Sequence, residues 1–493
     1  MALQYRMNQD HPATAARRVA HNTIYLAVAD IANKLMAFVF FMVLARHLGA
    51  SKFGIFSFAL AFVNMFAVLT DFGLGFFTAR EIARDYRIAR RLVSNGIAIR
   101  LTASVLVIGI IALLVNLLGY PEATVRVVYI CSVFVLTNAL GLYYGNVFQG
   151  FERMQFTALS RLVQTAIMIT GALLLVRGEP IVERYALLYV GAALVAVILM
   201  FILVSMRFVR PTLSFRLREW GRMLRPALPF GVTTILVAFY YWNGSVLLSK
   251  MCSDEAVGIY NAPFRLVAGV GFLAAAFSGA VYPLMSRMFV VNGGQLRRNV
   301  TERSLRYMVS LAVPLGVLGA TLARPVTLLV YGAGYDGSVV VMRTLVWWGA
   351  CVYINSLLSH YFFAINRPRT VTLQATLSLA VNVILNLLLI PRLGALGAAV
   401  SIVAAEATGS VFLFVNQLRT PGKVRLGMLL NFVARAFGAA VIVAPVAWLA
   451  ARWHALAGLA IALLGYFALM VLFRGFGRDD LNMLRLMLRR DDG

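Results

Sequence analysis

The sequence predicts an all-α integral membrane protein with about fourteen transmembrane helices. Hydrophobic residues make up 61% of the 493 residues and charged residues 13%, and the mean hydropathy is +0.83. A soluble chain of this length cannot bury so much apolar surface, whereas one membrane-spanning helix takes up about 20 apolar residues. The apolar stretches do not alternate with a period of two residues, so helices and not a β-barrel are expected to satisfy the backbone.

The expected helices follow one another with short connections and no inserted soluble domain. They cover residues 22–45, 53–79, 95–118, 123–150, 157–176, 184–207, 226–250, 256–286, 304–323, 339–365, 370–390, 394–418, 430–450 and 455–473. The polar start at 1–21 is read as an uncleaved tail, because the first apolar stretch is too long for a signal-peptide core. The end at 474–493 is read as a basic amphipathic helix on the membrane surface.

Basic residues are distributed unevenly between the loops. Lys and Arg number 45 and Asp and Glu 19, a net charge of +26. About 30 of the basic residues lie in the tails and in every second loop, and only about 9 lie in the other loops. Such loops include the segments Arg84–Arg91 and Arg207–Arg225. The bias predicts that both termini are cytoplasmic, and it makes the net charge a topology signal and not a nucleic-acid footprint.

Motifs for catalysis and metal binding are missing from the sequence. Gly422-Lys423 lacks the glycine pattern of a phosphate-binding loop, and the three cysteines have no metal-ligand spacing. The five histidines are scattered: His11, His21, His47, His360 and His454. An ATP-driven pump and a membrane metalloenzyme are therefore disfavoured, and no cofactor is expected.

A short internal repeat relates the two halves of the chain. When Gly54 is aligned with Gly258, Phe56 falls on Tyr260 and Arg46 on Lys250, six spans later. Because six is even, the halves would be parallel repeats about an axis along the membrane normal. Chance similarity between apolar segments is the alternative. The repeat predicts a lobe at 22–207, a basic cytoplasmic linker at 208–225, a second lobe at 226–418 and two further helices at 430–473.

Several motifs resemble those of Wzx-like polysaccharide-biosynthesis flippases, within the multidrug/oligosaccharidyl-lipid/polysaccharide exporter superfamily. They lie at 44–56 (LARHLGASKFGIF), 71–74 (DFGL), 80–83 (REIA), 331–335 (YGAGY), 385–391 (LNLLLIP) and 394–399 (GALGAA). The resemblance implies two six-helix lobes around a V-shaped cavity, with two appended helices. It also implies flipping of an undecaprenyl-pyrophosphate-linked oligosaccharide by alternating access, with a polymerase and a chain-length regulator as candidate partners. It does not separate O-antigen, capsule, exopolysaccharide and teichuronic-acid systems.

Charged residues inside the predicted spans are the candidate functional residues. A charge that faces lipid costs roughly 2.5–3.5 kcal/mol on insertion scales, so such residues are expected to face the interior or to reach the surface. The basic ones are Lys34, Arg100, Arg126, Arg161, Arg265 and Arg435, and the acidic ones are Asp30, Asp71 and Glu406. Arg100, Arg126 and Arg435 lie near span ends and are expected to extend to the surface.

Arg265 is the strongest candidate for binding pyrophosphate. It shares one helix face with small and polar residues, which suits a cavity lining as well as a packed seam. That face carries Gly258, Asn261, Ala268, Gly269, Phe272, Ala276 and Gly279. The segment Tyr260–Leu266 also resembles the start of the eighth helix of the lipid II flippase, where an arginine serves the pyrophosphate. A structural ion pair or a capping arginine is the alternative.

Three further cations complete the predicted pyrophosphate site. Lys34 stands four residues after Asp30, and the two would form either a structural ion pair or a pair that substrate separates. Arg161 shares a face with Gln164, and Lys250 lies near the outer end of the seventh span.

Asp30, Asp71 and Glu406 are candidates for coupling or gating. Glu406 is the only acid well inside its span and suits proton coupling, although a protonated glutamic acid bonded to a carbonyl explains it equally. Asp71 with Gly73 and Gly75 marks either a functional polar face or a kink. Asn382 and Asn386 are expected to join helices.

Four functions compete. A lipid-linked oligosaccharide flippase needs intramembrane cations that replace the water around pyrophosphate. A cation or drug antiporter of the same superfamily needs net acidic lining, whereas six basic residues stand here against three acids. A membrane transferase needs an exposed acid or histidine near a donor-binding loop, and the sequence offers none. A non-transporting scaffold of a polysaccharide assembly machine stays open.

Overall fold

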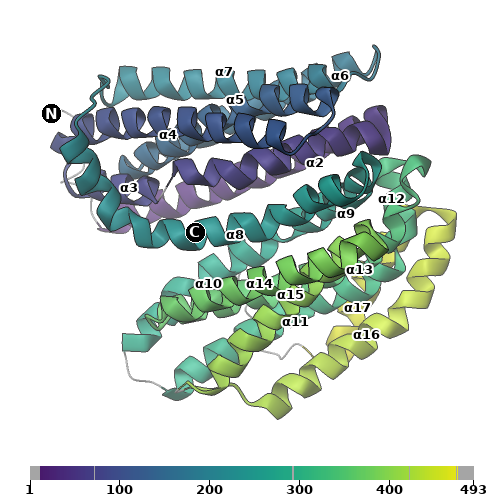
Figure 1. The fold of residues 1–493 in the computed structure, drawn as a ribbon. Coiled ribbons are helices and arrows are strands. Elements are labelled where there is room, and N and C mark those ends of the chain that lie inside the picture. Colours follow the sequence, from purple (N-terminus) through teal and green to yellow (C-terminus); the bar gives the residue numbers. More distant parts are fainter. Residues whose placement is uncertain (1–11, 72, 291–293, 421, 474, 476–493) are drawn as a thin grey trace. The chain divides into compact units, whose positions relative to one another are not determined.

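The protein, seen in a computed structural model, folds into α-helices and short 3-10 turns over the residues that the structure describes (Figure 1). Those residues are 12–71, 73–290, 294–420, 422–473 and 475. The predicted basic helix at 474–493 lies outside them, apart from Gly475. The chain forms two compact units, and the boundary between them lies within helix α8, between Trp242 and Asn243. Unit 1 holds the chain up to Leu48 and Ile55–Trp242, and unit 2 holds Gly49–Gly54 and the chain from Asn243.

Unit 1 is a bundle of long helices. It holds most of α2 (Pro12–Ala67), a 3-10 turn η1 (Val68–Thr70), α3 (Leu74–Arg84), the 3-10 turn η2 (Tyr86–Ile88), α4 (Ala89–Leu117), α5 (Glu122–Gly150), α6 (Gln155–Leu175), α7 (Val182–Arg207) and the start of α8 (Leu217–Met251). Helix α5 packs against α3, α4 and α7, and α7 packs against α6. Their shared core centres on Tyr143, Val147 and Phe148 of α5.

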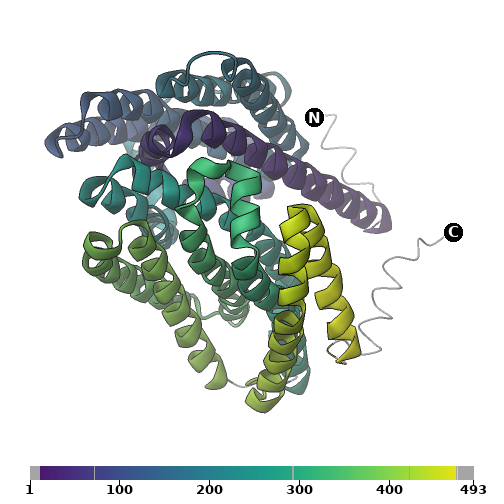
Figure 2. The same ribbon diagram turned by 90° about the vertical axis from the view of Figure 1, so that its right-hand side faces the viewer.

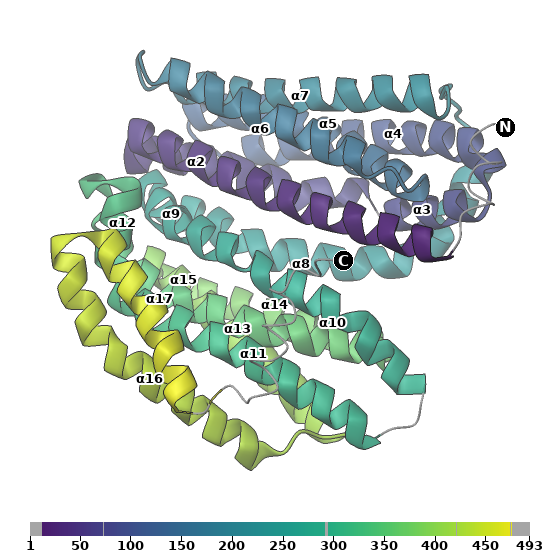
Figure 3. The ribbon, with the colours of Figure 1, turned by 180° about the vertical axis from the view of Figure 1, so that it is seen from behind.

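Unit 2 contains the rest of the chain. Its helices are the end of α8, α9 (Asp254–Val270), α10 (Phe272–Val290), α11 (Gly294–Thr321), α12 (Ala323–Tyr331), α13 (Ser338–Ala364), α14 (Pro368–Leu393), α15 (Ala395–Leu418), α16 (Leu426–Trp453) and α17 (Ala455–Leu472), with the 3-10 turn η3 (Ala333–Tyr335). Helix α13 contacts α9, α10, α11 and α15. The two last helices lie side by side, and α16 also packs on α11 (Figures 2 and 3).

The buried carboxylate of Glu302 on α11 forms hydrogen bonds to the start of helix α16. Glu302 accepts hydrogen bonds from the backbone N–H of Arg425 at 2.8 Å and from its guanidinium Nη2 at 3.1 Å. The carboxylate thereby caps the N-terminus of α16, where freed N–H groups favour negative charge.

The helix order and approximate helix number agree with the sequence prediction. Within the described residues, 12 segments are long and apolar enough to cross a membrane. The first, Ile31–Thr70, has 40 residues and overlaps the first two predicted spans, 22–45 and 53–79. It bends at Gly49, whose φ of 70° and ψ of 172° lie outside the helical region. The seventh predicted span lies within α8, which is 35 residues long. The all-α membrane fold with about fourteen transmembrane helices is therefore confirmed.

Two predicted spans are interrupted. Of the two alternatives for Asp71, the kink is present, because α2 gives way to η1 and α3 starts only after Gly73, whose φ is 77°. The predicted span 256–286 corresponds to one candidate membrane span, Asp254–Arg287, in which Gly271 separates α9 from α10. In α9, Pro263 has no N–H for the carbonyl of Ile259, and the hydroxyl of Ser338 donates to that carbonyl at 2.8 Å. Helix α13 thus supplies hydrogen bonds that an irregular helix lacks.

Candidate functional site

The two glycines paired by the internal repeat make a reciprocal contact within unit 2. A Cβ atom on Gly54 would lie 1.7 Å from the carbonyl oxygen of Asp254, and one on Gly258 would lie 1.9 Å from that of Ala50. Ala50 and Asp254 each stand four residues before their glycine and occupy equivalent positions of the repeat. The contact therefore supports the predicted alignment, because a duplicated element that packs on its copy gives each contact twice.

Arg265 is half-buried in the last two turns of α9. Burial raises the pKa of Tyr331, at the end of α12, and the positive charge of Arg265 opposes that rise. The guanidinium therefore lies near this phenol, whose hydroxyl donates to the carbonyl of Ala262 at 2.7 Å. On α9, Phe264 stacks against Trp348 with ring centroids 5.0 Å apart, which anchors the helix to α13. Arg265 thus lies on a helix that packs against α13, inside the membrane span Asp254–Arg287.

Lys34 and Arg161 lie on two helices of unit 1 that touch beside them. The hydroxyl of Thr165 on α6 donates to the side-chain oxygen of Asn33 on α2 at 2.5 Å. The same hydroxyl also lies 3.0 Å from the carbonyl oxygen of Arg161, one turn earlier. Both cationic side chains are exposed. The structure therefore brings these two predicted residues to neighbouring helices.

Lys250 is the fourth predicted pyrophosphate ligand, and Asp30 is the predicted partner of Lys34. Lys250 is exposed in the last turn of α8 and belongs to unit 2, as Arg265 does. Asp30 lies in α2, but its side chain is outside the described part of the structure, so its pairing with Lys34 stays a prediction.

Arg100 contradicts the prediction that it extends to the surface. Its side chain is 0% exposed, and it forms an ion pair with Asp71. Its Nη1 donates to the carbonyl of Ala139 at 3.0 Å, and its guanidinium lies 4.9 Å from the ring centroid of Tyr143. The prediction failed because α4 begins at Ala89, well before the expected start at 95, which places Arg100 deep inside the helix. The seven-residue spacing of Asn64, Asp71 and Thr78 was the available signal for a polar face here.

Arg126 and Arg435 are exposed, as predicted for residues near helix ends. Arg126 stands in the first two turns of α5 and lies 4.0 Å from Glu122. Arg435 donates through Nη1 to the carbonyl of Phe473 at 3.1 Å and so caps the end of α17. Neither contact indicates a role in substrate binding.

Glu406 is buried in unit 2 beside a neutral amide. Glu406 is only 7% exposed. The side-chain amide of Asn355 on α13 donates to its Oε1 at 2.5 Å and to its backbone carbonyl at 3.2 Å. A buried carboxyl that faces an amide suits either proton binding or a structural bond. The coupling role of Glu406 stays a prediction.

Asn382 and Asn386 join helices, as predicted. Asn243 of α8 donates to Asn382 at 2.8 Å and accepts from Asn386 at 2.7 Å. All three are buried, so these two hydrogen bonds join α8 to α14 inside unit 2.

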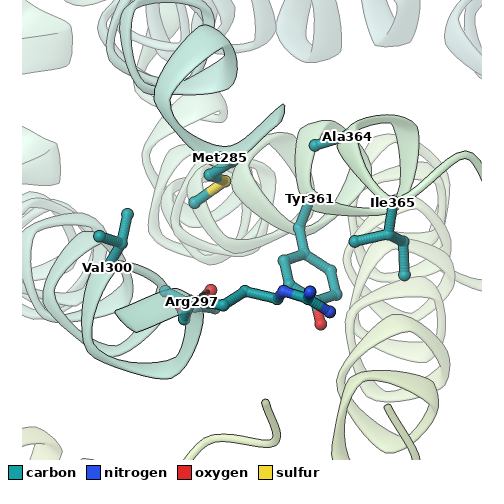
Figure 4. A pocket seen from close by; sticks show the side chains of 7 residues that line it. Met285, Arg297, Val300, Tyr361, Ala364 and Ile365 are labelled. Atoms are coloured by element: carbon teal, nitrogen blue, oxygen red, sulfur yellow. Dashed lines mark hydrogen bonds between the residues drawn. The ribbon is translucent and has the colours of Figure 1, made fainter. Parts of the chain in front are cut away.

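A small cavity lies elsewhere in unit 2 and holds none of the predicted site residues. Its space of about 220 Å³ includes open solvent, and it encloses no room for a water molecule. Arg297 of α11 and Tyr361 of α13 lie next to each other at its wall, and apolar side chains make up most of the rest (Figure 4). Among the described residues, no cluster of His, Cys, Asp and Glu suits a metal ion.

Comparisons with known proteins agree with this architecture. The family model described as "Polysaccharide biosynthesis protein" matches residues 19–289. A probable low-salt glycan biosynthesis flippase, Agl15, of Haloferax volcanii is 23% identical over 80% of this chain and 82% of its own length. A putative O-antigen transporter of Escherichia coli is 24% identical over 80% of this chain and 96% of its own.

Solved structures show the same fold. The lipid II flippase MurJ in an inward closed conformation matches with a TM-score of 0.71 and 15% identity, over 92% of this chain and 99% of that one. An inward-facing multidrug resistance MATE family transporter matches with a TM-score of 0.61 and 16% identity, over 81% and 96%. Since the family model covers more than half of the sequence, this chain belongs to the polysaccharide biosynthesis protein family.

Proposed function

We propose that the protein is a flippase that moves an undecaprenyl-pyrophosphate-linked oligosaccharide across the cytoplasmic membrane by alternating access. The observation that carries this proposal is a half-buried arginine, Arg265, held inside a membrane-spanning helix of a member of this family. Moving a pyrophosphate through the bilayer needs cations that replace its lost water, and an arginine fork binds phosphate oxygens in pairs. The names of the relatives, a glycan biosynthesis flippase and an O-antigen transporter, support the same substrate class.

In this proposal four cationic side chains engage the headgroup. Arg265 binds pyrophosphate as the principal ligand, and Lys34, Arg161 and Lys250 supply further positive charge. The polyprenyl tail stays in lipid throughout, because its transfer into water would expose a long apolar chain. Asp30, Asp71 and Glu406 are proposed to couple the transport cycle to an ion gradient or to gate it.

A cation antiporter is the first competing function. The MATE transporters share the fold at 16% identity, which by itself transfers no substrate. A cationic drug would be attracted by acidic lining, whereas Arg265, Lys34, Arg161 and Lys250 would repel it. The charge of these residues therefore favours an anionic substrate over a cationic one.

A scaffold that holds a polysaccharide polymerase and a chain-length regulator is the second competing function. It differs from a flippase in one measurable property. A purified flippase moves labelled lipid-linked oligosaccharide between the leaflets of a vesicle that contains no other protein, and a scaffold does not. Reconstitution therefore separates these two functions.

We also propose that the protein lies in the inner membrane with both termini in the cytoplasm. The support is the excess of Lys and Arg in the tails and alternate loops. Reporter fusions after Arg87, Arg216 and Arg367 should therefore report the cytoplasm, and fusions after Pro121 and Asp336 the outside. A cytoplasmic signal from both members of the second set would contradict this orientation.

A further inference from the structure

The hydroxyl of Tyr331 binds the turn of α9 that precedes Arg265. Tyr331 is the last residue of α12, and its hydroxyl donates to the carbonyl of Ala262 at 2.7 Å. Ala262 stands three residues before Arg265, so the two lie one turn apart on the same side of the helix. Side chains on a helix point back toward its N-terminus and cover the turn before their own Cα. The Arg265 side chain is therefore directed toward the turn whose carbonyl Tyr331 binds.

Electrostatics also place these two side chains near each other. Burial raises the pKa of Tyr331, and the positive charge of Arg265 opposes that rise. The effect of one charge on another group falls with the distance between them, so the guanidinium lies close to the phenol. Two independent features, the hydrogen bond to Ala262 and this electrostatic effect, thus connect Tyr331 to Arg265.

Aromatic packing and a left-handed glycine hold Tyr331 in place. Tyr331 is only 4% exposed, and its ring centroid lies 5.4 Å from that of Tyr335. Tyr335 is 1% exposed, and its ring meets the ring of Phe53 edge-on at 6.3 Å. Between the two tyrosines, Gly332 has a φ of 87°, which few residues other than glycine adopt. Because its ring has little room to move, the hydroxyl of Tyr331 is a fixed support beside the turn that carries Arg265.

This part of α9 depends on donors from outside the helix. Pro263 lies two residues before Arg265 and has no N–H for the carbonyl of Ile259, which accepts from the hydroxyl of Ser338 at 2.8 Å instead. Tyr331 supplies the next such bond along the helix. A side chain that is already restricted loses less entropy on binding, and a guanidinium binds phosphate oxygens in pairs only in a defined orientation. Support of this turn therefore favours binding of an anion by Arg265.

We propose that Tyr331 is a positioning residue for Arg265, and that it holds the guanidinium in the orientation that binds the pyrophosphate of the substrate. This inference rests on the proposed flippase function. Tyr331 acts through Arg265 and does not bind the substrate itself, because its buried hydroxyl is already bonded to the carbonyl of Ala262.

Chemical modification of Arg265 tests this support without a transport assay. Phenylglyoxal modifies arginine side chains, and mass spectrometry of the protein in lipid nanodiscs gives the rate at Arg265. In Tyr331→Phe, which keeps the ring and loses the hydroxyl, that rate should rise about threefold or more. Tyr353→Phe is the matched control, because Tyr353 is also buried and its hydroxyl donates to another carbonyl of α9, that of Val270, at 3.0 Å. The control should leave the rate at Arg265 within about twofold of the wild-type rate.

A second measurement keeps the hydroxyl and so does not depend on the folding of Tyr331→Phe. Fluorotyrosine incorporated at position 331 gives a fluorine NMR resonance, which should shift when Arg265→Ala removes the nearby charge. Fluorotyrosine incorporated at position 353 is the control, and its resonance should stay unchanged. An unchanged resonance at position 331 would overturn the proposal.

Flipping of labelled lipid in vesicles separates positioning from a merely structural role. Tyr331→Phe should raise the substrate concentration for half-maximal flipping about threefold or more and keep the maximal rate per folded protein within about twofold. In Arg265→Ala, adding Tyr331→Phe should change neither quantity, because Tyr331 acts through Arg265. A lower maximal rate with an unchanged half-saturating concentration would contradict the positioning role. So would an effect of Tyr331→Phe that is equally large with and without Arg265.

The two kinds of measurement also distinguish this inference from the proposed function. If Arg265 becomes more reactive in Tyr331→Phe while the wild type flips no lipid, the support of Arg265 by Tyr331 stands and the flippase function fails. If the wild type flips lipid while Tyr331→Phe changes neither the reactivity of Arg265 nor the half-saturating concentration, the flippase function stands and the positioning role fails.

Discussion

Arg265→Ala should reduce export of the polysaccharide at least about tenfold in cells that depend on this protein, because charge-assisted hydrogen bonds contribute roughly 1.5–3 kcal/mol each. Arg265 is only half-buried, so its removal leaves a small cavity and the variant should stay inserted and folded. Arg265→Lys should recover part of the export, since a point charge binds phosphate without the paired geometry of a guanidinium. The measurement is surface polysaccharide per cell, normalised to the amount of protein in the membrane.

Arg324→Ala is the matched control for that experiment. Arg324 lies in unit 2 as well, but it is 66% exposed and forms only a surface ion pair with Asp336 at 3.6 Å. Exposed pairs contribute about 0–1 kcal/mol, so this variant should export normally. Normal export by Arg265→Ala at normal abundance would remove Arg265 from the site.

Among glycine-to-alanine substitutions in α9, Gly258→Ala should lower the stability of the protein most. The added Cβ would lie 1.9 Å from the carbonyl oxygen of Ala50, so the helix must move away from the corner at Gly49–Gly54. Overpacking of this kind costs about 1–3 kcal/mol or more, because backbone atoms cannot turn aside as a flexible side chain can. We expect a lower thermal unfolding midpoint in detergent and a lower yield of folded protein. Gly54→Ala, with its Cβ 1.7 Å from the carbonyl oxygen of Asp254, should behave in the same way.

Gly269→Ala offers a control in the same helix. A Cβ at Gly269 meets nothing within 4 Å, and alanine favours the helix over glycine by about 0.5–1 kcal/mol. This variant should unfold at the wild-type temperature or slightly above it. Equal midpoints for Gly258→Ala and Gly269→Ala would show that the reciprocal glycine contact contributes little to stability.

Hydropathy predicted where the helices cross the membrane, but not where each helix ends. The span predicted at 304–323 corresponds to α11, which begins at Gly294, and the span at 226–250 corresponds to α8, which begins at Leu217. Both helices continue beyond the apolar stretch with polar and basic turns that water can solvate. A hydropathy window detects the apolar part of such a helix and misses the rest.

The errors at buried positions have a different cause. Arg100 was assigned to the surface because its distance from the helix end was underestimated, and only the fold shows that Asp71 and Ala139 lie within its reach. The division between α9 and α10 also depends on another element, since hydroxyl groups of α13 bind carbonyls near Pro263 and Gly271. Tyr353, for example, donates to the carbonyl of Val270 at 3.0 Å. Contacts between distant segments decide these features, and no local pattern in α9 encodes them.

The candidate site was predictable in its residue types more than in its geometry. Intramembrane cations are rare because they are costly, so Arg265, Lys34 and Arg161 stand out in the sequence alone. That α2 and α6 touch beside Lys34 and Arg161 follows from the bond between Asn33 and Thr165, which no spacing rule indicates. The proximity of Arg265 to Tyr331 likewise required the packing of α12 near α9.

Reconstitution of the purified protein tests the central claim most directly. Vesicles that contain this protein and no other would carry a fluorescent undecaprenyl-pyrophosphate oligosaccharide, and a membrane-impermeant quencher would report how much label has reached the outer leaflet. The account predicts that flipping proceeds with the wild-type protein, continues with Arg324→Ala and falls at least about tenfold with Arg265→Ala. Flipping of the wild-type sample no faster than in protein-free vesicles, with the protein shown to be folded, would contradict it.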